Sequence, residues 1–374
     1  MSNIGKIANA SALLPIRGVC YEPTPSDDTA PPLQRYFDSD YANSDFPLLW
    51  GKANSGRGDV ANLAGNVGVN FLHLYNWSVP PAPGTPPGPY QRNHLPFLDE
   101  CHTHHVKVFV PISNYFLEQI HQGNGTTVAT QISAMVTEIY DNKQTPHAAA
   151  GIWGIGNEFD LAGGFTVNDV VTAIQYLIAA EQALDIPPRA RLPITAPVSF
   201  ADPGGANKPG IVAIQNLQAA FVTAGLQAVW TDRFIASVNP FNDGAYLKTY
   251  IDNIFPTAFP DLPFFFTEMG SSIPGGGGTV TDEHTQAKYV LSQLHNSAPR
   301  ANFMGTCVFQ DLDQSAVKTG TEATFGMSKY VTPLSYTHGT IPSGYTPGGG
   351  ETYRVDTLQN KPLYDSVKTV YKAT

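Results

Sequence analysis

The chain has 374 residues, of which 42% are hydrophobic and 14% are charged, and its formal net charge is −10 at pH 7. This negative charge argues against nucleic acid or an anionic membrane as the partner, because both repel an acidic surface. No run approaches the eighteen apolar residues of a membrane span. The first residues lack the pattern of a signal peptide, so we expect a soluble protein, either cytoplasmic or secreted with its leader absent from this sequence.

Apolar runs bounded by turn residues alternate with helical patterns along the chain. Strands are expected over residues 16–21, 69–75, 106–111, 192–197, 234–239, 262–270 and 302–309, with one more inside 151–160. Helices are expected over residues 59–68, 95–105, 126–140, 167–184, 211–223, 244–254, 282–295 and 358–371. Asp59 has the position of a helix N-cap.

Eight strands that alternate with about eight helices predict an α/β fold, a closed parallel (β/α)8 TIM barrel. No linker or internal repeat divides residues 1–374, so we expect a single domain with long loops after strands one, two and eight. In such barrels the active site lies at the carboxyl ends of the strands. We therefore expect loops 23–58 and 77–90, which both carry aromatic residues, to wall a cleft on that face.

Two glutamates stand at strand ends on this face. Glu158 follows Asn157 in GIGNE, after the fourth strand, and Glu268 ends the seventh strand in LPFFFTEMG. Two carboxyl groups can divide the cleavage of a glycosidic bond, one donating a proton to the leaving oxygen and the other attacking the anomeric carbon. A structural role is an alternative, because a carboxylate is favourable at a helix N-terminus. General bases of a lyase or isomerase are another.

Four segments carry a family resemblance: GVCYEP, NVGVNFLHLYNW, GIGNE and FFFTEMGSS. They resemble clan A of the retaining glycoside hydrolases, most of all the fungal β-1,3-glucanosyltransferases and, more distantly, the β-1,3-glucanases. The resemblance implies a β-glucan-type carbohydrate substrate, with Glu158 as acid/base, Glu268 as nucleophile and Asn157 bonded to the sugar 2-hydroxyl. The two carboxyl groups would then lie about 5–5.5 Å apart. No metal and no organic cofactor is expected.

Three residues depart from the family pattern. His73 stands where such enzymes carry an arginine that helps to keep the nucleophile ionised, and Phe241, in NPFND, replaces a tyrosine that would contact the nucleophile. Phe309 stands where many members place a sugar-stacking tryptophan. These departures leave open a carbohydrate-binding barrel with impaired catalysis. Alternatively, the missing hydroxyl could come from Tyr21, Tyr75 or Tyr246.

The expected substrate contacts cluster at strand ends and in the adjoining loops. Trp77 begins an open proline-rich loop and is the better candidate for a sugar-stacking platform, whereas Trp153 lies within a strand and is expected in the core. The residues expected at the substrate site are Asn157, Trp77, Tyr75, His73, Asn239, Phe241, Phe309 and Tyr21.

Two further groups of residues are expected to be structural. The run ECHTHH, residues 100–105, resembles a metal-ligand cluster, but it closes a helix at the end of the barrel opposite to the glutamates. Cys20 and Cys307 fall on the first and last strands, which are neighbours in a closed barrel. Both are expected to be core residues, because free cysteine behaves as a small apolar side chain.

Overall fold

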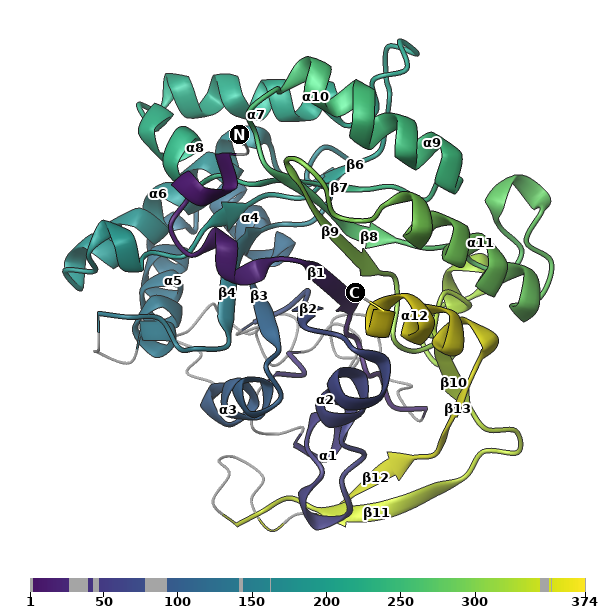
Figure 1. The fold of residues 1–374 in the computed structure, drawn as a ribbon. Coiled ribbons are helices and arrows are strands. Elements are labelled where there is room, and N and C mark those ends of the chain that lie inside the picture. Colours follow the sequence, from purple (N-terminus) through teal and green to yellow (C-terminus); the bar gives the residue numbers. More distant parts are fainter. Residues whose placement is uncertain are drawn as a thin grey trace.

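The centre of the molecule is a curled sheet of nine short parallel strands with helices around its outside (Figure 1). The computed structural model describes residues 3–26, 40–42, 47–77, 93–140, 144–161, 163–343, 350 and 352–373. Within those ranges every helix is too short or too polar to cross a membrane. The strands of the sheet are β1 (Ile16–Cys20), β2 (Phe71–His73), β3 (Lys107–Ile112), β4 (Ala150–Ile155), β5 (Ile194–Thr195), β6 (Val198–Ser199), β7 (Ala236–Asn239), β8 (Phe264–Met269) and β9 (Phe303–Val308).

These strands form the barrel predicted from the sequence, and the fold class is confirmed. Their order in the sheet is β5-β4-β3-β2-β1-β9-β8-β7-β6, so the sheet begins and ends with strands that are consecutive in the chain. The expectation of one continuous fifth strand, residues 192–197, is wrong. β5 pairs with β4 and β6 pairs with β7, and Pro197 between them has no N–H with which to continue a ladder.

The described helices lie around the barrel wall, and two π-helical segments, Leu63–Val67 and Tyr250–Ile254, continue α2 and α9. The helices are α1 (Pro47–Trp50), α2 (Asp59–Asn62), α3 (Leu95–Thr103), α4 (Asn114–His121), α5 (Gly125–Tyr140), α6 (Val167–Ala183), α7 (Ile211–Thr223), α8 (Gln227–Arg233), α9 (Gly244–Thr249), α10 (Phe255–Ala258), α11 (Glu283–Asn296) and α12 (Pro362–Ala373). Most agree with the prediction. The prediction missed four of them, α1, α4, α8 and α10.

Two local expectations about helix ends are wrong. Gly58, not Asp59, is the N-cap of α2, because the Asp59 carboxylate instead accepts bonds from Arg57 Nε at 2.6 Å and from the Tyr21 hydroxyl at 2.9 Å. Residues 358–360 do not begin the closing helix. They form strand β13 (Leu358–Asn360), and α12 starts only at Pro362, a residue well suited to a first helical turn.

The loop-rich stretch after the last barrel strand contains two small antiparallel sheets that the sequence did not predict. β10 (Ser328–Tyr330) pairs with β13, and β11 (Tyr336–Thr340) pairs with β12 (Thr352–Asp356). Figure 1 shows the β11–β12 ribbon beside α1, at the edge of the molecule.

Apolar side chains fill the barrel interior. Phe71 of β2 and Phe265 of β8 meet across it with ring centroids 6.1 Å apart, although their strands are not neighbours. Cys20 and Cys307 are buried in the same cluster as free thiols, which confirms their expected place in the core. The N-terminal 3-10 helices Asn3–Lys6 and Ala10–Leu13 contribute further members of this cluster and close the amino end of the barrel.

The first and last strands meet at a glycine that nothing larger can replace. Gly305 of β9 pairs with Ile16 of β1 and has a φ of +131°. A Cβ at this position would lie 2.1 Å from the Ile16 carbonyl oxygen, which belongs to the backbone and cannot turn aside.

We expect Gly305→Ala to lower the free energy of unfolding by about 2–4 kcal/mol, from backbone strain together with overpacking. Urea denaturation measures it. Gly278→Ala is the matched control, because Gly278 has a φ of +85° but its added Cβ would meet nothing within 4 Å. That variant should cost about 1 kcal/mol, and equal losses in the two variants would contradict the steric argument.

Candidate active site

Glu158 lies in a sharply turned loop after β4. Gly156 and Glu158 both have positive φ, +67° and +49°, and the second value is uncommon for a residue with a side chain. The loop is fixed by Asn114, the first residue of α4. Its Oδ1 accepts from the Asn157 N–H at 2.8 Å and its Nδ2 donates to the Asn157 carbonyl at 2.9 Å. Backbone strain held in place by its surroundings is typical of functional sites.

Glu268 lies at the end of β8 and is buried, with its side chain bonded to two donors. The Tyr75 hydroxyl donates to Oε1 at 2.8 Å, and Asn157 Nδ2 donates to the same oxygen at 3.0 Å. Tyr75 follows β2 and Asn157 follows β4, so the carboxyl ends of three strands meet at this one carboxyl group.

Asn239, the last residue of β7, joins the two glutamates. Its Nδ2 donates to Asn157 Oδ1 at 3.1 Å and to Glu158 Oε1 at 3.2 Å. Its own Oδ1 accepts from Thr267 Oγ1 at 2.8 Å. The structure therefore brings together Glu158, Glu268, Asn157, Asn239 and Tyr75, all of which the sequence had placed at the site.

Both carboxyl groups hold their protons more tightly than usual. Burial and the nearby Glu158 raise the pKa of Glu268 to about 8, although the bonds from Tyr75 and Asn157 oppose the rise. Burial also raises the pKa of Glu158, against the bond from Asn239, and the negative charges of Asp160 and Glu322 add to the rise. A buried carboxyl group with a pKa of about 8 beside a partly buried one with a raised pKa is an arrangement suited to acid–base chemistry.

His73 lies beneath Glu268 and carries no charge. Burial lowers its pKa to about 3, partly offset by the carbonyl of Thr267, which lies 3.0 Å from Nδ1. The Cys20 thiol is 3.5 Å from the same nitrogen and donates to the same carbonyl at 3.3 Å. His73 is thus a fully buried support of the strand end, and the expectation that it contacts substrate is wrong. It cannot supply the positive charge of the arginine that it replaces.

The hydroxyl that Phe241 lacks comes from Tyr75, one of the three tyrosines considered from the sequence. Burial, Cys20 and Glu268 raise the pKa of Tyr75, so its hydroxyl remains a donor. The Tyr21 hydroxyl is engaged with Asp59, and that of Tyr246 donates to Asn207 at 2.6 Å. The expected substrate role of Tyr21 is therefore wrong, because its ring is buried and its hydroxyl is bonded to Asp59.

Phe241 and Phe309 pack against each other at the carboxyl end of the barrel. Their ring centroids are 5.9 Å apart, and Phe325 contacts both, at 5.5 and 5.0 Å. The peptide bond that follows Phe309 is cis. Phe241 is only partly buried and Phe309 is 7% exposed, so this cluster is an apolar wall rather than a single flat platform.

The expectation that Trp77 stands in an open loop is wrong. Its side chain is 0% exposed and stacks on His94 with ring centroids 3.9 Å apart. Burial lowers the pKa of His94, but Asp40 and Glu138 outweigh it and raise the pKa to about 9. The imidazolium attracts the indole face, so Trp77 is a core residue. The rest of loop 77–90, and residues 27–39 and 43–46 of loop 23–58, lie outside the described residues.

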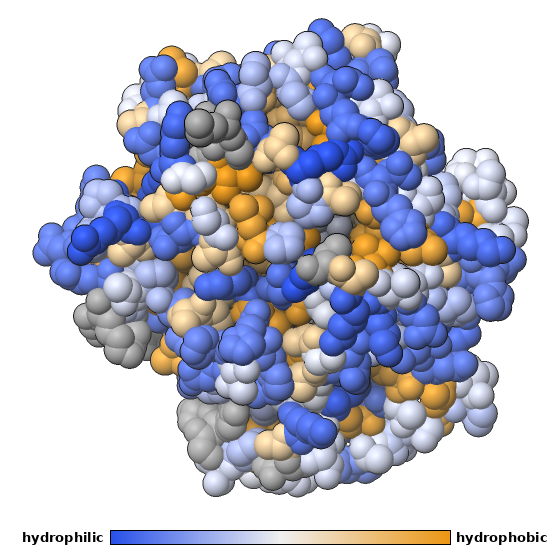
Figure 2. Space-filling view, viewed as in Figure 1, coloured by the Kyte–Doolittle hydropathy of each residue, from blue (hydrophilic) through white to orange (hydrophobic). Residues whose placement is uncertain are grey.

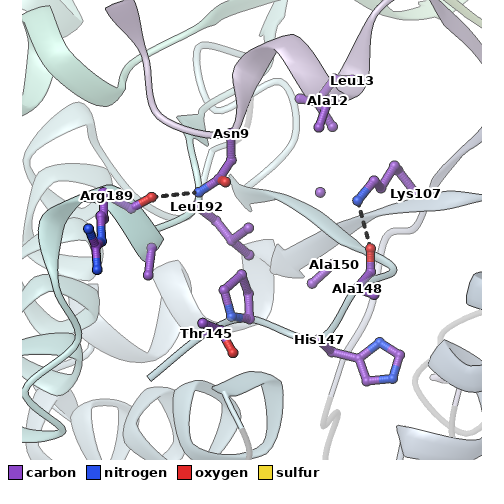
Figure 3. Close-up of a pocket in the computed structure, with 13 residues that line it drawn as sticks. Asn9, Ala12, Leu13, Lys107, Thr145, His147, Ala148, Ala150, Arg189 and Leu192 are labelled. Carbon is purple, nitrogen blue, oxygen red and sulfur yellow. Dashed lines mark hydrogen bonds between the residues drawn. The ribbon is translucent and has the colours of Figure 1, made fainter. Parts of the chain in front are cut away.

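Two cavities open at the opposite end of the barrel. One, of about 390 Å³, is lined by Lys107 and Ala150 at the starts of β3 and β4, and by Asn9 and Arg189 (Figure 3). The other, of about 480 Å³, includes His104 and His105 of the histidine run, together with Arg17, Asn70 and Lys372. Both are therefore separated from the glutamates by the length of the barrel.

Several supporting residues escaped the sequence reasoning. Asn114 follows β3 just as Asn157 follows β4, so the strand-end rule could have found it. Glu22 follows β1, and its negative charge raises the pKa of Glu268 further. Asp160, which accepts from the Ser199 N–H at 2.8 Å and its hydroxyl at 2.5 Å, ties the Glu158 loop to β6. Only the folded chain reveals that contact.

Three solved structures that resemble this chain in fold are glycoside hydrolases. The GH2 β-galacturonidase from Eisenbergiella tayi bound to galacturonate matches 96% of this chain at 16% identity and a TM-score of 0.56, and this chain spans about half, 52%, of its length. The GH10 xylanase from Bispora sp. MEY-1 with xylobiose is 12% identical, with a TM-score of 0.52, over 99% of this chain and 100% of the xylanase. A family 39 glycoside hydrolase from Bacteroides cellulosilyticus WH2 is 13% identical, with a TM-score of 0.51, over 98% of this chain and 64% of that one.

The sequence itself has no comparable match. No protein-family model and no curated protein matches the chain. At the identities of the solved structures the likeness is one of fold alone, that of the (β/α)8 barrel.

The raised pKa of Glu268 has a consequence for stability. Below the ordinary glutamate pKa the folded and unfolded states are both protonated, and between that value and about 8 only the unfolded state ionises. Stability should therefore fall as pH rises through this window. The glutamine in Glu268→Gln does not titrate. The Tm of this variant minus that of the unmodified protein should therefore increase as pH rises from 5 to 8.5. A constant difference in Tm across this range would contradict the assignment.

Proposed function

We propose that the protein is a retaining β-glycosidase or transglycosylase that acts on a β-glucan-type polysaccharide or oligosaccharide. Glu158 is the acid/base and Glu268 the nucleophile. The observation that carries the proposal is the hydrogen-bonded chain from Glu158 through Asn239 and Asn157 to Glu268, at the carboxyl ends of strands β4, β7 and β8.

In the first step Glu158 donates its proton to the leaving glycosidic oxygen while Glu268 attacks the anomeric carbon. Tyr75 and Asn157 both donate to Oε1 of Glu268, so the attack falls to Oε2. The bond to the leaving sugar breaks with its electron pair, and a covalent glycosyl-enzyme ester forms on Glu268. The same donors stabilise Oε1 as negative charge shifts within the carboxyl group.

In the second step Glu158, now a carboxylate, removes a proton from water or from a sugar hydroxyl. The oxygen attacks the anomeric carbon, and the ester bond breaks to return Glu268 as a carboxylate. Two inversions give net retention. Formation of the ester removes the charge of Glu268, and the raised pKa of the free Glu158 fits it to hold a proton before that step.

One specific observation favours a second candidate, a carbohydrate-binding barrel with impaired catalysis. The groups that act most on Glu268 are Glu158, Tyr75, Asn157 and Glu22, and none of them carries positive charge. A pKa of about 8 leaves much of Glu268 protonated near neutral pH, and a protonated carboxyl group is a poor nucleophile. The two candidates differ in whether a covalent intermediate forms.

A panel of 2,4-dinitrophenyl β-glycosides with 2-fluoro substituents tests the intermediate. We expect one sugar of the panel to add its glycosyl mass to the Glu268 peptide, because the fluorine slows the second step more than the first.

With ordinary aryl glycosides, Glu268→Ala should abolish turnover and Glu158→Ala should lower it about 10²–10⁴-fold for poor leaving groups. Azide should rescue Glu158→Ala with a β-glycosyl azide as product and Glu268→Ala with the α anomer. Full turnover by Glu268→Ala, or an inverted product from the unmodified enzyme, would sink the proposal.

The pH dependence of kcat/KM provides a second test. If Glu268 attacks as a carboxylate, kcat/KM should rise with pH along a limb whose apparent pKa is about 8. Tyr75→Phe removes a donor to that carboxylate, so it should move the limb to higher pH and lower kcat/KM about 10–100-fold, the value of a hydrogen bond to a charged group. Tyr246→Phe, which removes a hydroxyl bonded to Asn207 on the surface, is the matched control. An acid limb near pH 4.5 in the unmodified enzyme would contradict the burial argument.

A further inference from the structure

The β11–β12 ribbon carries an unusual aromatic side chain. Tyr336 is 47% exposed, and among the side chains that the structure describes no other phenylalanine, tyrosine or tryptophan is an exposed one. Single apolar residues on a surface need no explanation by themselves. Tyr336 differs because its ring is held in a fixed position by charged neighbours.

The two faces of the ribbon have different surroundings. Val355 is buried and belongs to a small apolar cluster with Leu48 of α1 and Ile341, so one face packs onto the body of the protein. Side chains alternate between faces along a strand. Tyr336 and His338 therefore share the other face with Arg354, which pairs with His338 across the ribbon.

Arg354 holds the Tyr336 ring from one side. The guanidinium carbon lies 3.9 Å from the ring centroid. The guanidinium itself is fixed by two bonds, from Nε to Asp356 at 2.8 Å and from Nη2 to the Ser26 hydroxyl at 2.5 Å. A ring already fixed in place loses little conformational entropy when a ligand packs on its other face.

The ribbon is bound to the loop that leaves the catalytic face. Asp356 accepts from the Ser26 N–H at 2.8 Å and from its hydroxyl at 2.6 Å. Ser26 is four residues after Glu22, a distance of at most about 14 Å along an extended chain, and the charge of Glu22 acts on Glu268. Tyr336 pairs with Asp356 across the ribbon, so the ring lies a few sugar lengths from the two glutamates, on the same side of the barrel.

We propose that Tyr336 is a sugar-stacking platform that binds a distal part of the polysaccharide chain whose cleavage point lies at Glu158 and Glu268. This inference rests on the proposed function for its choice of ligand. The apolar face of a pyranose ring packs on an aromatic ring, and the imidazole of His338, whose centroid is 5.5 Å from that of Tyr336, lies beside it to bond a hydroxyl group. The net charge of −10 favours a neutral chain over an acidic one.

Native gels that contain soluble β-1,3-glucan, xylan, mannan or galactan test the platform. The parent protein carries Glu268→Gln, so that no polymer is cleaved during the run. We expect one neutral polysaccharide to retard the parent, Tyr336→Ala to weaken its Kd about 2–10-fold, as for loss of an aromatic contact, and Tyr336→Phe to retain it. Thr337→Ala, on the opposite face of the ribbon, is the matched control and should bind as the parent does. Tm values verify that each variant is folded.

The outcomes separate this inference from the proposed function. Weaker retardation of Tyr336→Ala than of the parent supports the platform, whether or not the unmodified protein cleaves any glycoside. In an active enzyme, the same substitution should lower the ratio of kcat/KM for polymer to kcat/KM for an aryl glycoside. Equal retardation of Tyr336→Ala and the parent, equal weakening in Thr337→Ala, or a parent that none of the polysaccharides retards would overturn it.

Discussion

A carboxyl group buried at the end of β8 with neutral partners is the constraint from which the rest of the site follows. The Glu268 side chain is almost fully buried, so its ionised form depends on hydrogen bonds from the protein. The two donors that reach it, Tyr75 and Asn157, follow β2 and β4, the two strands that flank β3 in the sheet. Each is in turn held by its own neighbours: Asn157 by Asn114 and Asn239, and Tyr75 by the tilted ring of His73 at 4.6 Å. Strand ends that are fixed by the barrel can hold such donors in place more rigidly than flexible loops can.

The neutral supports beneath Glu268 illustrate a balance between stability and reactivity. An arginine at position 73 would pair with the Glu268 carboxylate, but it would also have to be desolvated inside a barrel filled with Phe71, Phe109 and Phe265. His73 and Cys20 fill that space without a charge, and each finds an acceptor in the Thr267 carbonyl. The protein thereby avoids one buried cation, and the Glu268 carboxyl group is harder to ionise.

The parts of the structure that the sequence predicts well are those set by local pattern. Apolar strands ending in Asn157-Glu158 and in Glu268 predict both the barrel and the meeting of these side chains, because parallel strands share one carboxyl edge. Side chains whose partners are distant in sequence were harder to place. The proline-rich run that follows Trp77 indicated an open loop, yet its ring stacks on His94 and bonds to Glu138 in the core. Likewise, the strands of the β11–β12 ribbon are short and polar, and only their packing on α1 makes them a sheet.

The seam between β1 and β9 joins positions that are separated by about three quarters of the chain, as the pairing of Ile16 with Gly305 shows. Until β9 is made and docked, the growing sheet has two unpaired edges whose backbone groups can bond to another chain. The entropy cost of closing so long a loop rises only slowly with its length, but contacts of this range form late. The 3-10 helices that close the amino end of the barrel cannot complete their packing before that moment. The stage of synthesis most exposed to misassembly is therefore the one just before the last barrel strand is in place.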